Sequence, residues 1–291
     1  AGRPLLASVD PRTEVVRVLT AAQAGRAVLP DDADAFTDAV ADLTSRPAEL
    51  VAMGERGRAW VERWISPEAV AEALWPHVRL WVTLNEPIVF LLGGYLGGKI
   101  PPGHSSFGAA ARALEHLLRA HTEASGAIAS RGPGGRIGIA HNMMEFAPDR
   151  RDSALDRRLA KQAERLYNLA LLEGIATGRL DWSFPGQGRV RARLDGLPSS
   201  NHFVGVNYYS RVHIRFRGVP GGIGEYFYRD PAARGLTDTG WEIHPEGFDA
   251  VLRQAAQTGL PIVVTENGIA TRDDRRRQNF LRDHALVMAH R

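Results

Sequence analysis

The sequence has 291 residues, a formal net charge of +3 at neutral pH and no cysteine. Without cysteine the chain can form neither a disulfide nor a thiolate metal site, and it offers no thiol nucleophile. The length suits one large domain or two smaller ones, and a hydrophobic content of 44% is enough for a packed core. No apolar run approaches the roughly 18 residues of a membrane span, so no membrane partner is expected. The first residues also lack the pattern of a secretory signal, which predicts a cytoplasmic protein.

Nearly all of the basic residues are arginines, and Lys99 and Lys161 are the only lysines. The densest charged run, residues 272–278, mixes basic with acidic side chains, which is typical of a solvated helix face. A nucleic-acid surface would instead gather basic residues on one face. We therefore expect no nucleic-acid partner.

Residues 1–75 have the pattern of a small α/β region. Short apolar runs at 3–8 and 26–30 predict two strands. Amphipathic spacing and capping residues predict helices at 13–25, from Asp32 onward, at 49–64 and at 66–78.

The pattern changes from about residue 76 onward. Four apolar runs appear that do not alternate with polar residues, which is typical of parallel strands covered on both faces. These predicted strands are residues 79–84, 136–140, 203–209 and 261–265. Helical patterns lie between them at 106–129, 153–175 and 246–258, so this region consists of β/α units.

Polar residues follow three of these strands at the same relative place. They are Asn85 with Glu86, Asn207 with Tyr208 and Tyr209, and Glu266 with Asn267. The strand at 136–140 ends in His141 and Asn142, which is a weaker match. In a (β/α) barrel the carboxyl ends of the strands meet at one mouth, where catalytic groups sit. We therefore expect these polar residues to lie together.

Two carboxylates across a pocket suit the cleavage of a glycosidic bond, because one can protonate the leaving oxygen while the other attacks or activates water. Asn85 could bond the sugar 2-hydroxyl, and Tyr209 could donate a hydrogen bond to Glu266. A single glutamate at a strand end is more often a surface acid, so the hypothesis depends on Glu86 and Glu266 together. No group of His, Asp and Glu has the spacing of a metal site, and we expect neither metal nor cofactor.

The strings TLNEP at 83–87 and TENG at 265–268 resemble the acid/base and nucleophile motifs of glycoside hydrolase family 1, the β-glucosidases and their relatives. Further agreeing strings are GYLGGKIPPG (94–103), HLLRAH (116–121), FVGVNYYS (203–210) and GWEIHPEGF (240–248). The resemblance implies a retaining mechanism that acts on a small β-glucoside or oligosaccharide, with carboxylate oxygens about 5–5.5 Å apart.

The same resemblance implies a role for each of these residues. Glu86 would be the general acid/base and Glu266 the nucleophile. Asn85 would bind the 2-hydroxyl, Asn207 would support the pair, and Tyr209 would orient the nucleophile. Within the resembling strings, Trp241 is interpreted as a packing residue, and His116 and His121 as core or supporting groups.

The resemblance covers residues 76–291 and only strands four to seven of an eight-stranded barrel. The predicted fold is therefore a partial (β/α)8 TIM barrel of the α/β class. A half barrel leaves two open parallel edges and an uncovered inner face. These edges offer a route to homo-oligomers.

Residues 1–75 resemble a different family, the carboxyl-terminal end of family 4 glycosyltransferases. The resembling strings are AGRPLLAS, EVVRVL, RAVLPDDADAFTDAV and MGERGRAWVERWISPEAV. This predicts a Rossmann-like α/β fragment that lacks the donor-binding glutamates of that family. Three interpretations follow: a β-glucosidase-like hydrolase, a catalytically inactive fusion with a sugar-binding role or none, and a remnant glycosyltransferase.

Overall fold

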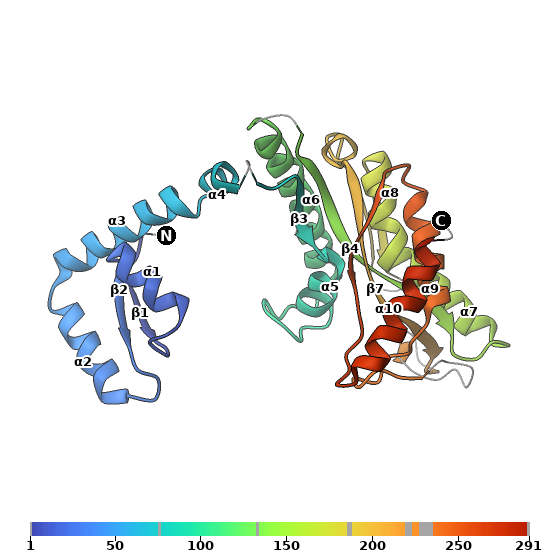
Figure 1. Ribbon diagram of the computed structural model, residues 1–291, viewed down its shortest axis with the longest axis horizontal. Helices are drawn as coiled ribbons and strands as arrows, with labels where there is room; N and C mark the ends of the chain where they lie inside the picture. The colour runs from blue at the N-terminus through green and yellow to red at the C-terminus, as the bar shows by residue number, and fades with distance from the viewer. Residues whose placement is uncertain are drawn as a thin grey trace. The chain divides into compact units, whose positions relative to one another are not determined.

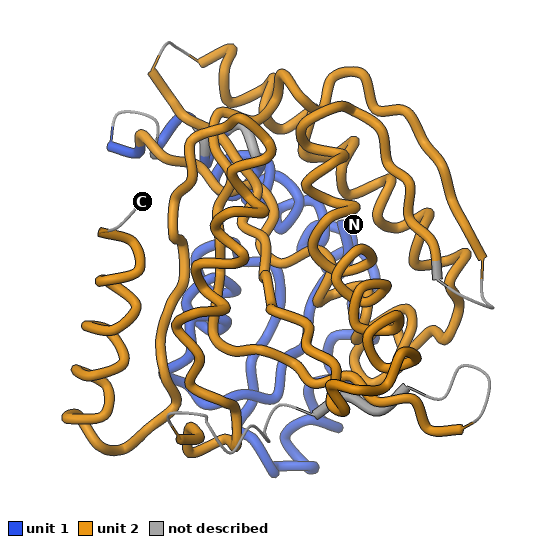
Figure 2. Tube along the Cα trace, turned by 90° about the vertical axis from the view of Figure 1, so that its right-hand side faces the viewer, with its two compact units in different colours: residues 1–78 blue, residues 79–291 orange. Residues whose placement is uncertain are grey.

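The computed structural model describes residues 2–74, 77–131, 134–184, 188–218, 223–226 and 235–289. The chain divides into two compact units, residues 1–78 and residues 79–291 (Figure 2). No helix in the described ranges is long and apolar enough to cross a membrane.

Unit 1 contains one β/α/β element followed by three helices. Strands β1 and β2 pair in parallel, from Leu5↔Gly25 to Ser8↔Val28. The elements are β1 (Leu5–Ser8), α1 (Glu14–Ala22), β2 (Gly25–Val28), α2 (Ala33–Thr44), α3 (Pro47–Trp64) and α4 (Pro67–Leu74). Helix α2 begins as predicted, because the Asp32 carboxylate accepts the Ala35 N–H at 2.9 Å and caps the first turn. The two-strand pair confirms an α/β unit, while its assignment as a Rossmann-like fragment stays a prediction.

Unit 2 is built on a curled parallel sheet that forms part of a barrel. Its parallel strands follow the order β3-β4-β7-β9 (Figure 1). They are β3 (Leu80–Asn85), β4 (Arg136–Pro148), β7 (Phe203–Phe216) and β9 (Ile262–Asn267), and β8 (Ile223–Tyr226) pairs with β7 in the antiparallel direction. The four predicted strands and the partial barrel are therefore confirmed.

Helices join these strands in the expected β/α order. They are α5 (Pro87–Leu91), α6 (Phe107–Ala129), α7 (Ala154–Glu164), α8 (Ala170–Thr177), α9 (Pro245–Ala256) and α10 (Asp274–Ala289), with π-helical turns η1 (Leu92–Leu96) and η2 (Arg165–Leu169) and a short turn η3 (Pro198–Ser200). The single helix predicted at 153–175 is interrupted by η2, since one extra residue widens that turn.

Two features of unit 2 differ from the sequence-based expectation. Strands β4 and β7 continue well beyond residues 140 and 209, because the two extensions pair with each other up to Pro148↔Ile214. The segments β5 (Arg179–Phe184) and β6 (Gly188–Arg193) form an antiparallel hairpin that was not predicted. Its arginines alternate with small apolar residues, so the pattern carried no continuous apolar run.

The hydrophobic core lies between the sheet and its helices. It includes Leu114 and Leu118 of α6, Ile139 of β4, Val206 of β7 and Phe248 of α9, none of which is exposed. The edge strand β3 differs, because Leu80 and Val82 are 41% and 42% exposed. These exposed apolar side chains are what an open barrel edge leaves in solvent.

Candidate active site

Glu86 stands at the junction between β3 and α5. Its backbone is left-handed, with φ at 50° and ψ at 50°, which costs a residue with a side chain about 1–2 kcal/mol. Its N–H donates to the Ala140 carbonyl at 2.8 Å, and Pro87 then starts the helix. The carboxylate oxygen Oε1 accepts from Asn142 Nδ2 at 3.0 Å and from Asn207 Nδ2 at 2.9 Å. Backbone and side chain are therefore both held in one orientation.

Asn207 connects the two outer strands of the sheet through the buried strand β7. Its Nδ2 also donates to Asn85 Oδ1 at 3.1 Å, and its Oδ1 accepts from the Thr265 hydroxyl. The side chain has no exposed surface. The structure thus brings Asn207 together with the adjacent pair Asn85 and Glu86, which lies 122 and 121 residues earlier in the sequence.

Asn142 is a member of this network that the sequence indicated only weakly. Besides donating to Glu86, it accepts the Tyr167 hydroxyl at 2.7 Å through Oδ1. The signal was present, because Asn142 follows a buried apolar run as Asn85 and Asn207 do. It was obscured since β4 continues through this position.

Glu266 lies on the opposite edge strand, β9. The Tyr209 hydroxyl donates to Glu266 Oε2, and Asn267 Nδ2 donates to the Tyr208 carbonyl at 2.8 Å. Burial raises the pKa of Tyr209, and its hydrogen bond to Glu266 and the charges of Glu266 and Glu86 raise it further. Tyr209 is therefore a neutral hydrogen-bond donor at physiological pH.

A cavity of about 1120 Å³ joins the two glutamates. Glu86, Glu266, Tyr209, Asn142 and Trp241 all line it, while Val89, Leu92 and Leu96 supply an apolar wall. Trp241 contacts Tyr209 edge to face, with ring centroids 6.1 Å apart. The interpretation of Trp241 as a packing residue was therefore incomplete, because its ring is also a wall of the cavity.

A buried ionic cluster anchors the segment that carries Trp241. Glu242 has no exposed surface, and its carboxylate accepts from Arg211 Nη2 at 2.7 Å and lies 3.0 Å from His213 Nε2. Burial pushes the pKa of Glu242 upward, but Arg211 and His213 outweigh burial and leave the pKa lowered. No local sequence pattern indicates this cluster, because Glu242 lies 31 and 29 residues from Arg211 and His213.

The two predicted supporting histidines behave differently. His121 is buried, its Nδ1 contacts the Thr83 hydroxyl, and burial lowers its pKa to about 4. His116 is exposed on α6, so the expectation that it is a core or supporting group was wrong. It falls on the solvent face because helical spacing separates it from the buried stripe of Leu114, Leu118 and His121.

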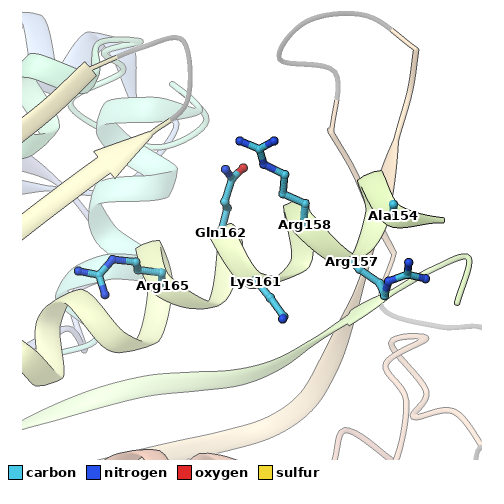
Figure 3. Close-up of a pocket in the computed structure, with 6 residues that line it drawn as sticks. All are labelled: Ala154, Arg157, Arg158, Lys161, Gln162 and Arg165. Atoms are coloured by element: carbon cyan, nitrogen blue, oxygen red, sulfur yellow. The ribbon is translucent and has the colours of Figure 1, made fainter. Parts of the chain in front are cut away.

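A second hollow of about 550 Å³ lies along α7. Figure 3 shows that Arg158 and Gln162 project from one side of the helix and Lys161 from the other. These side chains do not converge on a common point. The hollow is therefore a solvated cationic helix face.

The sequence matches the family model of glycosyl hydrolase family 1 over residues 66–290. It is 30% identical over 264 residues to a beta-galactosidase of Pyrococcus woesei, covering 76% of this chain and 50% of that protein. It is also 30% identical over 226 residues to beta-glucosidase A of Thermotoga maritima, covering 72% of this chain and 50% of that protein. The chain thus spans about half the length of these curated relatives.

Solved structures agree with the sequence comparison. The beta-glycosidase from Pyrococcus horikoshii has a TM-score of 0.67 at 26% identity, over 94% of this chain and 70% of that one. A beta-glucosidase from Exiguobacterium marinum has a TM-score of 0.63 at 26% identity, over 80% of this chain and 60% of that one. From its family match and its fold, the chain belongs to glycosyl hydrolase family 1.

Proposed function

We propose that this chain hydrolyses β-glycosidic bonds in β-glucosides or short oligosaccharides by a retaining double displacement. The observation that carries the proposal is that Glu86 and Glu266 line one cavity, each oriented by hydrogen bonds of its own. A retaining hydrolase needs two carboxylates that face the same bond with separate roles. The relatives named beta-galactosidase and beta-glucosidase support this reaction class.

In the first step, a Glu266 oxygen attacks the anomeric carbon while Glu86 gives its proton to the departing oxygen. In the second step, Glu86 removes a proton from water, which displaces Glu266 and releases the sugar. Within the described residues, both amide donors bond to Oε1 of Glu86, which leaves Oε2 for proton transfer. Tyr209 likewise holds Oε2 of Glu266 and leaves Oε1 for attack.

The two polar side-chain atoms of Asn85 have different partners in this proposal. Asn85 is exposed and is not among the residues that line the cavity, but its neighbour Glu86 is. Asn85 Oδ1 accepts from Asn207, which among the described residues leaves Nδ2 for the sugar 2-hydroxyl. Such a hydrogen bond strengthens in the oxocarbenium-like transition state. Asn207 then acts as a support that fixes both Asn85 and Glu86.

The test is hydrolysis of a chromogenic aryl β-glucoside by the purified chain, beside a Glu266→Ala variant. Activity that disappears in the variant supports the proposal. Activity that persists in the variant would come from a contaminant or another site and would refute it.

The competing function is sugar binding without turnover. It is favoured by the edge strand β3, where the apolar side chains of Leu80 and Val82 are exposed. Calorimetry with a β-glucoside separates the two, because a folded chain that binds the sugar but never cleaves it is a binding fragment.

The open edges of the sheet also support self-association in our proposal. A second copy could cover the exposed β3 edge, and the apparent mass in sedimentation would then rise with protein concentration. We further propose a cytoplasmic location.

For residues 1–75 we keep the hypothesis of a family 4 glycosyltransferase remnant fused to a hydrolase fragment at 76–291. A functional remnant would bind a nucleotide sugar. Titration of UDP-glucose into the chain without any heat change would remove that alternative.

A further inference from the structure

Lys99 holds a distinctive position in the candidate active-site cavity. It is the only cation among the described residues that line the cavity, whose other charged groups are Glu86 and Glu266. The chain has just one other lysine, Lys161, on α7. The cavity is therefore lined by one ammonium group as well as by two carboxylates. A neutral sugar does not need this positive charge for binding.

The backbone of Lys99 is fixed to the wall of the cavity. Its N–H donates to the Gly93 carbonyl at 2.9 Å, and the same loop returns through His104 N–H, which donates to the Gly94 carbonyl at 2.8 Å. A side chain at Gly94 would place its Cβ 2.8 Å from the Pro101 carbonyl oxygen. Residue 94 must therefore be glycine for the loop to pack this closely against η1. This close packing fixes the position of the Lys99 backbone.

The ammonium group of Lys99 is available to a ligand. Lys99 is exposed, and no carboxylate pairs with it among the residues that the structure describes. Leu92 and Leu96 of η1 line the same side of the cavity with apolar surface. An apolar molecule with a negative group would match both features, because ammonium-to-carboxylate hydrogen bonds are stronger than neutral ones.

The position of Lys99 assigns it to the leaving-group half of the cavity. Lys99 belongs to the segment that runs from Glu86 through α5 and η1. At about 1.5 Å per residue, Gly93 and the Lys99 backbone bonded to it lie about 10 Å along the helix from Glu86. Glu86 faces the departing oxygen in the proposed mechanism, so this wall contacts the aglycone.

We propose that Lys99 selects β-glycosides whose aglycone has an apolar body bearing a carboxylate, such as a carboxyaryl group. This inference rests on the proposed function and adds a substrate class to it. Lys99 is a specificity residue here and takes no part in bond cleavage. Its contribution is one ion pair of an exposed lysine, which corresponds to a preference of up to about fivefold.

The experiment measures binding of two thioglycosides that resist hydrolysis. They are para-carboxyphenyl thio-β-glucoside and its neutral para-carbamoylphenyl analogue, titrated by calorimetry at low ionic strength. The wild type should bind the carboxylate about two- to fivefold more tightly than the amide. Lys99→Met should remove this preference, Lys99→Arg should keep most of it, and the matched control Lys161→Met should leave it unchanged.

The outcomes separate this inference from the proposed function. Equal binding of both compounds by the wild type, or a preference that survives Lys99→Met, would overturn the role of Lys99 and leave the sugar site standing. Binding of neither compound by the wild type would overturn the proposed function together with this inference. Loss of both compounds in Lys99→Met alone would show that Lys99 supports the cavity without selecting a charge, which also overturns it.

Discussion

The surroundings of Glu86 and of Glu266 differ in the chemistry that holds each carboxylate. Two asparagine amides from β4 and β7 hold Glu86, and its own backbone is left-handed. A tyrosine hydroxyl holds Glu266, which lies within a regular strand. Two amide donors on Oε1 fix the direction of Glu86 more tightly than the single phenol on Oε2 fixes that of Glu266, while each carboxylate keeps its other oxygen for reaction. The difference matches a proton-transfer group on one side and a nucleophile on the other.

The largest effects should come from removing each carboxylate, and they should differ in kind. Glu266→Ala should lower kcat by at least about 10⁴-fold for every aryl glucoside, because no covalent intermediate can form. Glu86→Ala should cost about 10²–10⁴-fold for poor leaving groups and far less for dinitrophenol, which departs without a proton. Steady-state rates across a series of phenols give the comparison. Equal losses of kcat in both variants for all leaving groups would contradict the separate roles of Glu86 and Glu266.

Glu242→Gln tests the anchor of the Trp241 segment on the Glu266 side. The variant leaves Arg211 buried without its carboxylate, so the free energy of unfolding should fall by about 3 kcal/mol. Urea denaturation measures this change. The control is Glu115→Gln, whose ion pair with Arg119 is exposed and should contribute less than about 0.5 kcal/mol. Similar losses in the free energy of unfolding in both variants would show that the Glu242 cluster stabilises the fold no more than an exposed ion pair does.

Asn207→Ala tests the network on the Glu86 side. It removes donors to Glu86 and Asn85 and an acceptor for Thr265, so the free energy of unfolding should fall by about 1–3 kcal/mol and kcat by about tenfold or more. Asn201→Ala is a matched control, because Asn201 is also buried and, among the described residues, its side chain bonds only to the Leu197 carbonyl of its own turn. The control should lose stability without a fall in kcat. A full kcat in Asn207→Ala would exclude a positioning role.

Tyr209→Phe should have the smallest effect and a pH signature. Its pKa is raised in the folded state, so its stabilisation is complete below the unfolded value near 10 and is lost as pH rises above it. The wild-type Tm should therefore fall more steeply between about pH 9.5 and 11 than the Tm of Tyr209→Phe. Some decline remains in the variant because burial also raises the pKa of Tyr208. Parallel curves would contradict a raised pKa of Tyr209 in the folded state.

The sequence predicted the parts of the fold that depend on local pattern. Continuous apolar runs identified the four parallel strands, and the expected cap at Asp32 marked a real helix start, since its carboxylate accepts the Ala35 N–H. Of the residues expected at the site, Asn207 bonds to Asn85 and Glu86, and Tyr209 bonds separately to Glu266.

What the sequence missed depends on contacts between distant segments. The Asn142 bond to Glu86 spans 56 residues, and the Arg211 bond to Glu242 spans 31. Nothing in the local pattern of either residue reveals its partner. The extended ends of β4 and β7 were missed for the same reason, because their polar residues are stabilised by pairing with each other.

Glu266 lies in β9 and Glu86 directly follows β3, and in the described part of the chain these two outermost parallel strands each pair along one side only. The distance between the two glutamates is therefore set by the twist of the intervening strands β4 and β7. Each of the outer strands β3 and β9 has about half the interstrand backbone hydrogen bonds of an interior strand. Edge strands of this kind open locally at a lower free-energy cost than the strands at the centre of a sheet. Amide hydrogens of β3 and β9 should then exchange with solvent faster than those of β4 and β7. Moderate heating would separate the carboxylates, and so end turnover, while the interior of unit 2 is still intact.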